Sequence, residues 1–160
     1  MEFFEKDLEE IIFTADKNKL ANRGLDLTEG KLFRQKRIGK YGVADLIHAY
    51  FDYEEINDNF YVKSVLHINV IELKKDKIGI SAFLQALGYL KGIQRYFEEK
   101  KVDYMVEYNI TLIGKSIDTS GSFPYLTDIF DSVSFYVYKY NFDGIYFYRE
   151  SEWKLIDEGF

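Results

Sequence analysis

Three residues of the sequence combine the acidic and basic groups that metal-assisted hydrolysis requires. Asp45 follows Gly42 in a short apolar run, and Glu72 and Lys74 lie two residues apart at the end of another. Residues two apart on a strand share a face. A strand pair that places one carboxylate opposite another forms an oxygen site for a divalent cation, and a lysine beside it can orient or deprotonate water. Because charges at the end of an apolar strand need a partner or a metal, we expect Mg²⁺ or Mn²⁺ between Asp45 and Glu72.

Composition excludes several other classes of site and of protein. The 160 residues, 47% of them apolar and 18% aromatic, are enough for one core and predict a single domain over residues 1–160. The absence of cysteine excludes disulfides, cysteine zinc sites and thiol catalysis, and two histidines leave little room for a histidine-based site. The longest apolar runs are too short for a membrane span, and the N-terminus is acidic where a signal peptide is basic. We therefore expect a soluble, cytoplasmic protein with no membrane partner.

The hydrophobic pattern predicts elements that can position these groups. Apolar residues at three- and four-residue steps predict a helix over residues 3–16, with Glu5 at the edge of the apolar stripe and Glu9 further round. A strand over 32–38, a turn at 39–42 and a strand over 43–51 follow, then a loop over 52–59 and a strand that starts near 60 or 65 and ends at Lys74.

The remaining chain predicts a crossover helix and further strands. Ser81 is a suitable N-cap for a helix to about residue 99. A strand over 102–113, a short helix over 125–130 and a strand pair over 133–140 and 145–148 complete the order. This order predicts an α/β fold with a central mixed sheet of about five strands and helices on both faces.

Four short motifs in this order resemble the PD-(D/E)xK nuclease superfamily. They are "EKDLEEII" (5–12), "GVADLI" (42–47), "INVIELKK" (68–75) and "QALGYL" (85–90). In motif order the likeness is closest to the NucS-type and RecB-type nuclease domains. The resemblance implies a restriction-endonuclease-like fold and a metal-dependent endonuclease that hydrolyses DNA phosphodiester bonds.

The resemblance also implies roles for individual residues. Asp45 and Glu72 match the metal-binding acids, Lys74 matches the catalytic lysine, and the backbone carbonyl of Leu73 supplies a third ligand. Glu5 matches the helix glutamate that completes the metal shell, with Glu9, one turn further on, as the alternative. Gln85 and Tyr89 match a glutamine–tyrosine pair that lines the site from the crossover helix.

Basic residues before and after the acidic pair give a path for DNA despite a net charge of −6. Alternation along 32–38 places Arg34 and Lys36 on one strand face and Arg37 on the other. We expect the approach to the metal to be lined by five cations, which are Lys36, Arg37, Lys40, Lys75 and Lys77.

Two other functions fit the same residues. One is a non-catalytic binding or assembly module that keeps the nuclease fold, since fold does not fix function. The other is a structural protein whose aromatic C-terminal strands mediate assembly. The presence of Asp45, Glu72 and Lys74 together favours the enzyme. With no separate DNA-binding domain in 160 residues, specificity is expected to need a homodimer or a partner protein.

Overall fold

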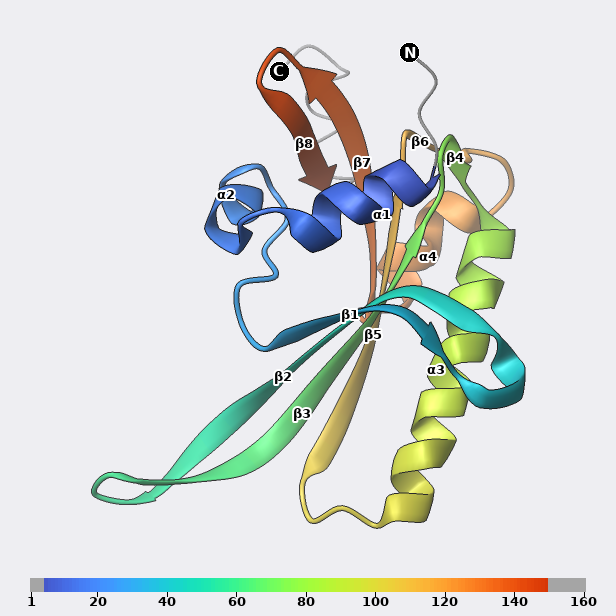
Figure 1. Cartoon of the computed structure of the whole chain (residues 1–160). Helices are drawn as coiled ribbons and strands as arrows, with labels where there is room; N and C mark the ends of the chain where they lie inside the picture. The colour runs from blue at the N-terminus through green and yellow to red at the C-terminus, as the bar shows by residue number, and fades with distance from the viewer. Residues whose placement is uncertain (1–4, 150–160) are drawn as a thin grey trace.

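A computed structural model describes residues 5–149, which form a mixed α/β fold around one six-stranded sheet (Figure 1). The helices are α1 (Glu5–Thr14), α2 (Lys17–Asn22), α3 (Ile80–Lys100) and α4 (Leu126–Ile129), with 3₁₀ turns η1 (Gly39–Tyr41) and η2 (Phe123–Tyr125). The strands are β1 (Lys31–Arg37), β2 (Val43–Asn57), β3 (Phe60–Leu73), β4 (Lys77–Ile78), β5 (Met105–Gly114), β6 (Ser116–Ile117), β7 (Val133–Asn141) and β8 (Gly144–Arg149). No helix in this range is long and apolar enough to cross a membrane.

The main sheet has the strand order β1-β2-β3-β5-β7-β8, so it contains six strands where about five were predicted. The β1-β2, β2-β3 and β7-β8 pairs are antiparallel, whereas β3-β5 and β5-β7 are parallel. A parallel neighbour requires a crossover connection, and α3 supplies it between β3 and β5. The predicted mixed sheet and crossover helix are therefore confirmed.

Helices cover both faces of the sheet, as predicted, and divide the core in two. On one face, α1 and α2 bury Leu8, Ile12 and Leu20 against Ile71 and Leu73 of β3. On the other face, α3 packs against Ile68 and Val70 of the same strand, using Ala82, Ala86 and Ile93. Successive β3 side chains alternate between these two cores, which is the period of a strand covered on both faces.

Two predictions of local structure are wrong. Residues 52–59 are not a loop, because β2 continues to Asn57 and pairs with β3 as far as Phe60. Strand pairing thus overrides the acidic, Asn-containing composition of this stretch. The second error is the omission of α2, a six-residue helix whose N-cap Asp16 accepts a hydrogen bond from the Lys19 amide. A helix this short leaves too little periodicity to detect.

The crossover helix differs from its prediction at the start and on its buried face. α3 begins at Ile80 after an N-cap at Gly79, so Ser81 is not the cap. Leu84 and Leu87, whose helical spacing with Phe83 and Ile93 predicts that they belong to an apolar stripe facing the core, are 56% and 42% exposed, while the buried face includes the small Ala82 and Ala86. Close approach of the helix to the sheet favours alanine on the contact face.

β1 also departs from simple alternation. Gln35 has φ of +48°, in the left-handed region, and its side chain joins that of Arg34 at Glu9 on the α1 side. Beyond it, Lys36 lies with Phe33 on the α3 side, its Nζ 5.7 Å from the Phe33 ring centroid. Arg34 and Lys36 therefore do not share a face, because the backbone of Gln35 reverses the alternation.

Candidate metal-dependent hydrolytic site

Asp45 and Glu72 meet where β2 and β3 lie side by side. The antiparallel register pairs Leu46 with Ile71, so the next step places Asp45 opposite Glu72. The Asp45 carboxylate accepts a hydrogen bond from the Leu73 amide at 3.1 Å, which fixes it at the end of β3. Two carboxylates thus converge on neighbouring strands, the arrangement that suits a hard divalent cation.

The Glu72 carboxyl group is buried, and its contacts with other side chains do not fully replace the water that it loses. Its side chain is 3% exposed, and its Oε2 atom has no hydrogen-bond partner within residues 5–149. Burial, followed by the nearby Asp45 charge, raises the pKa of Glu72 to about 8. Burial also raises the pKa of Asp45, against the hydrogen bond from the Leu73 amide. Removing water from two adjacent acids is costly, and a bound cation is one way to offset that cost.

Lys74 lies beside this pair and is held from α3. Its Nζ is 3.9 Å from Glu72 Oε1 and donates to Gln85 Oε1 at 3.4 Å. Gln85 Nε2 in turn donates to the Tyr89 hydroxyl at 2.9 Å. Lys74 is partly exposed whereas Glu72 is not, so the ammonium lies between the buried acids and solvent. The structure therefore brings together Asp45, Glu72, Lys74, Gln85 and Tyr89, as the sequence predicted.

Glu5 lies near the site without joining the acidic pair. Its Oε1 accepts a hydrogen bond from the Lys75 amide at 3.3 Å, just after β3 ends. Its charge contributes to the raised pKa of both Asp45 and Glu72. From this position a carboxylate can act on a cation through water, and the helix glutamate that the resemblance assigns to Glu5 completes the metal shell either directly or in this way.

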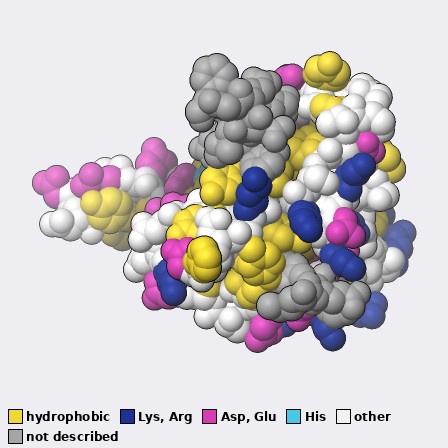
Figure 2. Space-filling model, turned by 90° about the horizontal axis from the view of Figure 1, so that it is seen from above, with side chains coloured by type: hydrophobic (Ala, Val, Ile, Leu, Met, Phe, Trp, Pro, Cys, Tyr) yellow, Lys and Arg dark blue, Asp and Glu magenta, His cyan; other side chains and the backbone are white. Residues whose placement is uncertain are grey.

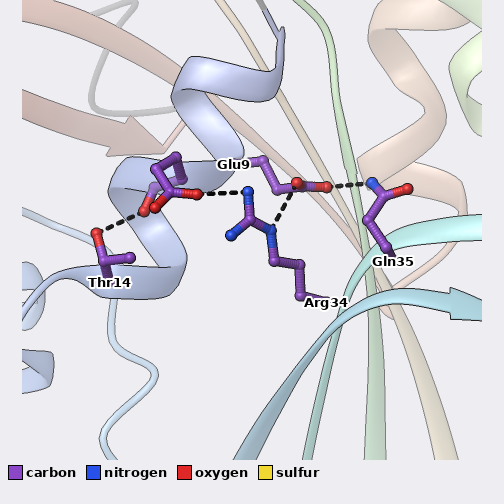
Figure 3. Close-up of polar contacts among 5 residues, drawn as sticks. Glu9, Thr14, Arg34 and Gln35 are labelled. Atoms are coloured by element: carbon purple, nitrogen blue, oxygen red, sulfur yellow. Dashed lines mark hydrogen bonds and ion pairs between the residues drawn. The ribbon is translucent and has the colours of Figure 1, made fainter.

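Glu9, the alternative to Glu5, is buried and already has partners (Figure 3). One carboxylate oxygen accepts from Arg34 Nε at 2.9 Å and the other accepts from the Gln35 side-chain amide. The helical pattern placed Glu9 further from the apolar stripe than Glu5, yet Glu9 is 5% exposed and Glu5 is exposed. The reason is that β1 covers this flank of α1.

Few side chains at this site can act as ligands to a metal ion. Within residues 5–149, no group of three or more His, Asp or Glu side chains is arranged to hold a metal ion. Two carboxylates do converge, however, and one has an orphaned buried oxygen. Asp45 and Glu72 therefore fit a hard cation as a minimal pair, with the Leu73 carbonyl and water as the remaining oxygen ligands.

The basic residues fall into two groups. Lys75 lies in the turn just after β3 and Lys77 begins β4, and Figure 2 shows lysine and arginine side chains on this end of the molecule. Lys40 lies in η1, which ends just before Gly42, where a Cβ atom would come within 3.2 Å of the Tyr89 ring. Lys36 and Arg37 line a groove between β1 and α3 instead.

A Glu72→Gln change is expected to stabilise the metal-free protein at pH 8 and to flatten its pH dependence. Between about 4.5 and 8 the folded protein holds a proton on Glu72 that the unfolded chain releases. Raising the pH through this window therefore favours unfolding, by at most about 1.4 kcal/mol per pH unit for one group. Urea unfolding of both proteins in EDTA at several pH values measures this. If the unfolding free energy of the wild type instead rises between pH 5.5 and 8, and Glu72→Gln shows the same pH dependence, the result contradicts the burial of Glu72.

In comparisons with known proteins, no family model, no curated protein and no solved structure matches the chain. The geometry of the Asp45–Glu72–Lys74 cluster is thus the basis on which a function is inferred for this mixed α/β chain.

Proposed function

We propose that the chain is a metal-dependent DNA endonuclease with a restriction-endonuclease-like fold. The observation that carries the proposal is the buried Glu72 carboxylate, with one oxygen unpartnered, opposite Asp45 and beside Lys74. A solvated ion pair would not need burial of the acids, and two adjacent buried carboxyl groups are costly unless a proton or a cation lies between them. The resemblance in motif order supports DNA as the substrate.

Asp45, Glu72 and the Leu73 carbonyl would hold Mg²⁺ or Mn²⁺. The bound cation would lower the pKa of water and stabilise negative charge on the phosphate oxygens. Lys74 Nζ lies on the solvent side of the acids, where it orients the attacking water or takes its proton. The water oxygen then bonds to phosphorus as the bond to the leaving sugar oxygen breaks.

Gln85 and Tyr89 position the lysine. Gln85 Oε1 accepts from Lys74 while its amide group donates to Tyr89, which is 4% exposed and anchored in the α3 core. This chain of hydrogen bonds restricts the ammonium to the region beside Glu72. A positioned group contributes more to a transition state than one that must be ordered during the reaction.

Lys40, Lys75 and Lys77 would contact the DNA phosphates nearest the site, whereas Lys36 and Arg37 line the separate groove between β1 and α3. Such contacts bind DNA of any sequence and make affinity dependent on salt. Tyr89 is buried, so it would not touch DNA itself. It would support DNA binding by holding Gln85 and by forming the floor of the site.

The test is cleavage of supercoiled, single-stranded and branched DNA by the purified protein with Mg²⁺ or Mn²⁺. We expect nicking that stops with EDTA and is lost in Glu72→Gln, a near-isosteric variant that keeps the fold. Wild-type protein that binds DNA but cleaves none of these substrates would favour the non-catalytic module. Equal cleavage by the variant would remove the proposed site.

A further inference from the structure

The far ends of β2 and β3 form an arm, residues 52–63, that leaves the body of the molecule (Figure 1). β1 pairs with β2 only as far as Ala49, and β5 pairs with β3 only from Val65 onward. Beyond these points, within residues 5–149, β2 and β3 pair only with each other. At about 3.3 Å per residue, the ribbon from residue 52 to residue 58 extends roughly 20 Å.

The arm carries apolar side chains that its own strands do not cover. Tyr53, Ile56, Phe60 and Tyr61 are each between 55% and 58% exposed. An isolated two-stranded ribbon is marginally stable in water, and clustered exposed apolar side chains mark an interaction site. The arm thus has the properties of a segment that becomes covered by a partner.

The arm is also acidic. Residues 52–63 contain four acids and one lysine, a net charge of −3. Figure 2, seen from above, shows acidic and hydrophobic side chains together on the projection at the left. A surface that receives the arm must therefore offer an apolar floor and positive charge.

Such a surface lies on the same molecule, on the sheet face that α3 leaves open. Two adjoining cavities of about 620 and 840 Å³ share Phe33, Ala49, Ile68 and Phe97 and form one groove between β1, β2 and α3. Its floor is apolar. The arm's own base forms one wall of the larger cavity, so strand pairing directs the tip away from its own groove.

The smaller cavity is the positive end of the groove. Lys36, Arg37 and Arg95 line it, against the single acid Glu99. Within residues 5–149, none of these three cations makes a salt bridge, and Arg95 lies over the Tyr41 ring with its guanidinium carbon 6.0 Å from the centroid. Cations without acidic partners are available to carboxylates from another chain.

We propose that two copies of this chain form a symmetric dimer in which each acidic arm lies in the groove of the other copy. One chain carries both complementary surfaces, so a two-fold axis satisfies both contacts at once and closes the assembly. The arm face that carries Tyr53, Glu55 and Tyr61 covers the apolar floor, so that Glu55, together with Asp58 at the tip, faces Lys36, Arg37 and Arg95. The inference does not rest on the proposed nuclease function.

The experiment is a charge swap read by light scattering after size exclusion, without DNA. Wild type is expected at twice the 18.9 kDa mass of one chain. The arm variant Glu54→Lys/Glu55→Lys/Asp58→Lys and the groove variant Arg37→Glu/Arg95→Glu are each expected at the mass of one chain. A control with two reversals elsewhere, Lys19→Glu/Lys115→Glu, is expected to remain dimeric.

Mixing the two monomeric variants provides the decisive measurement. Each arm then faces a groove of opposite charge, so a mixed dimer is expected to re-form at twice the chain mass. The proposal is overturned if the wild type is monomeric, if it is dimeric and both variants stay dimeric, or if mixing restores nothing. A monomeric wild type that binds single-stranded DNA through Arg95 would assign the groove to nucleic acid instead.

Discussion

Replacing Lys74 with alanine is expected to reduce DNA cleavage by about 10²–10⁴-fold, the usual contribution of a group that moves a proton or stabilises transition-state charge. The Nζ atom is 3.9 Å from Glu72 and bonded to Gln85, so its loss removes the only side-chain cation described in contact with the acidic pair. Mn²⁺ binding and the melting temperature should change little, because Lys74 is neither a ligand nor fully buried. Single-turnover cleavage with saturating metal measures the loss.

Two further variants distinguish a chemical role of Lys74 from a general effect of positive charge on DNA binding. Lys74→Arg keeps a positive charge but cannot readily give up a proton, so it should restore little activity. Lys115→Ala, which removes an exposed lysine after β5, should cleave at the wild-type rate. If Lys74→Ala cleaves as fast as the wild type, Lys74 has no role in the reaction.

Replacing Asp45 with asparagine is expected to abolish measurable Mn²⁺ binding by calorimetry. The change removes one of only two converging carboxylates but keeps an oxygen that can accept the hydrogen bond from the Leu73 amide. Because the pKa of Glu72 is raised to about 8, metal binding to the wild type at pH 7 must release a proton. Apparent affinity should therefore rise as the pH increases towards 8, and the measured heat should depend on the ionisation heat of the buffer.

Glu5→Gln and Glu9→Gln serve as comparison variants for metal binding. Glu5 touches the turn beside the acidic pair, so its loss should weaken Mn²⁺ binding by about 10–100-fold, as for a residue that acts through a ligand or water. Glu9 is held by Arg34 and Gln35, so Glu9→Gln should affect stability more than metal binding. Wild-type heats in Asp45→Asn would exclude Asp45 as a ligand.

The strand-helix-strand order around β3 was predictable because its signals are local and strong. The near-continuous apolar run of β3 predicts a strand covered on both faces, and its alternation predicts that Glu72 and Lys74 share one face; the structure shows that this face is the one that α3 covers. The long periodic pattern of α3 predicted the crossover helix. The predictions were least accurate at 52–59, where composition resembled a loop but pairing between β2 and β3 extends the strands.

The proposed site was predictable in part, for a related reason. Asp45, Glu72 and Lys74 lie at the ends of neighbouring strands, so period-two geometry alone brings them together. Gln85 and Tyr89 required the resemblance, since a glutamine and a tyrosine on a helix flank indicate no function by themselves.

The sequence by itself determined the mixed α/β class, the crossover helix and the placement of Glu72 and Lys74 on the same face of β3. Those features follow from periodicity within single segments. Only the tertiary structure decided that Glu9, not Glu5, is buried, that Arg34 is bound to it, and that Lys36 turns toward α3. These outcomes depend on β1 lying against α1 and on the left-handed backbone at Gln35, two long-range or conformational features that no local pattern encodes.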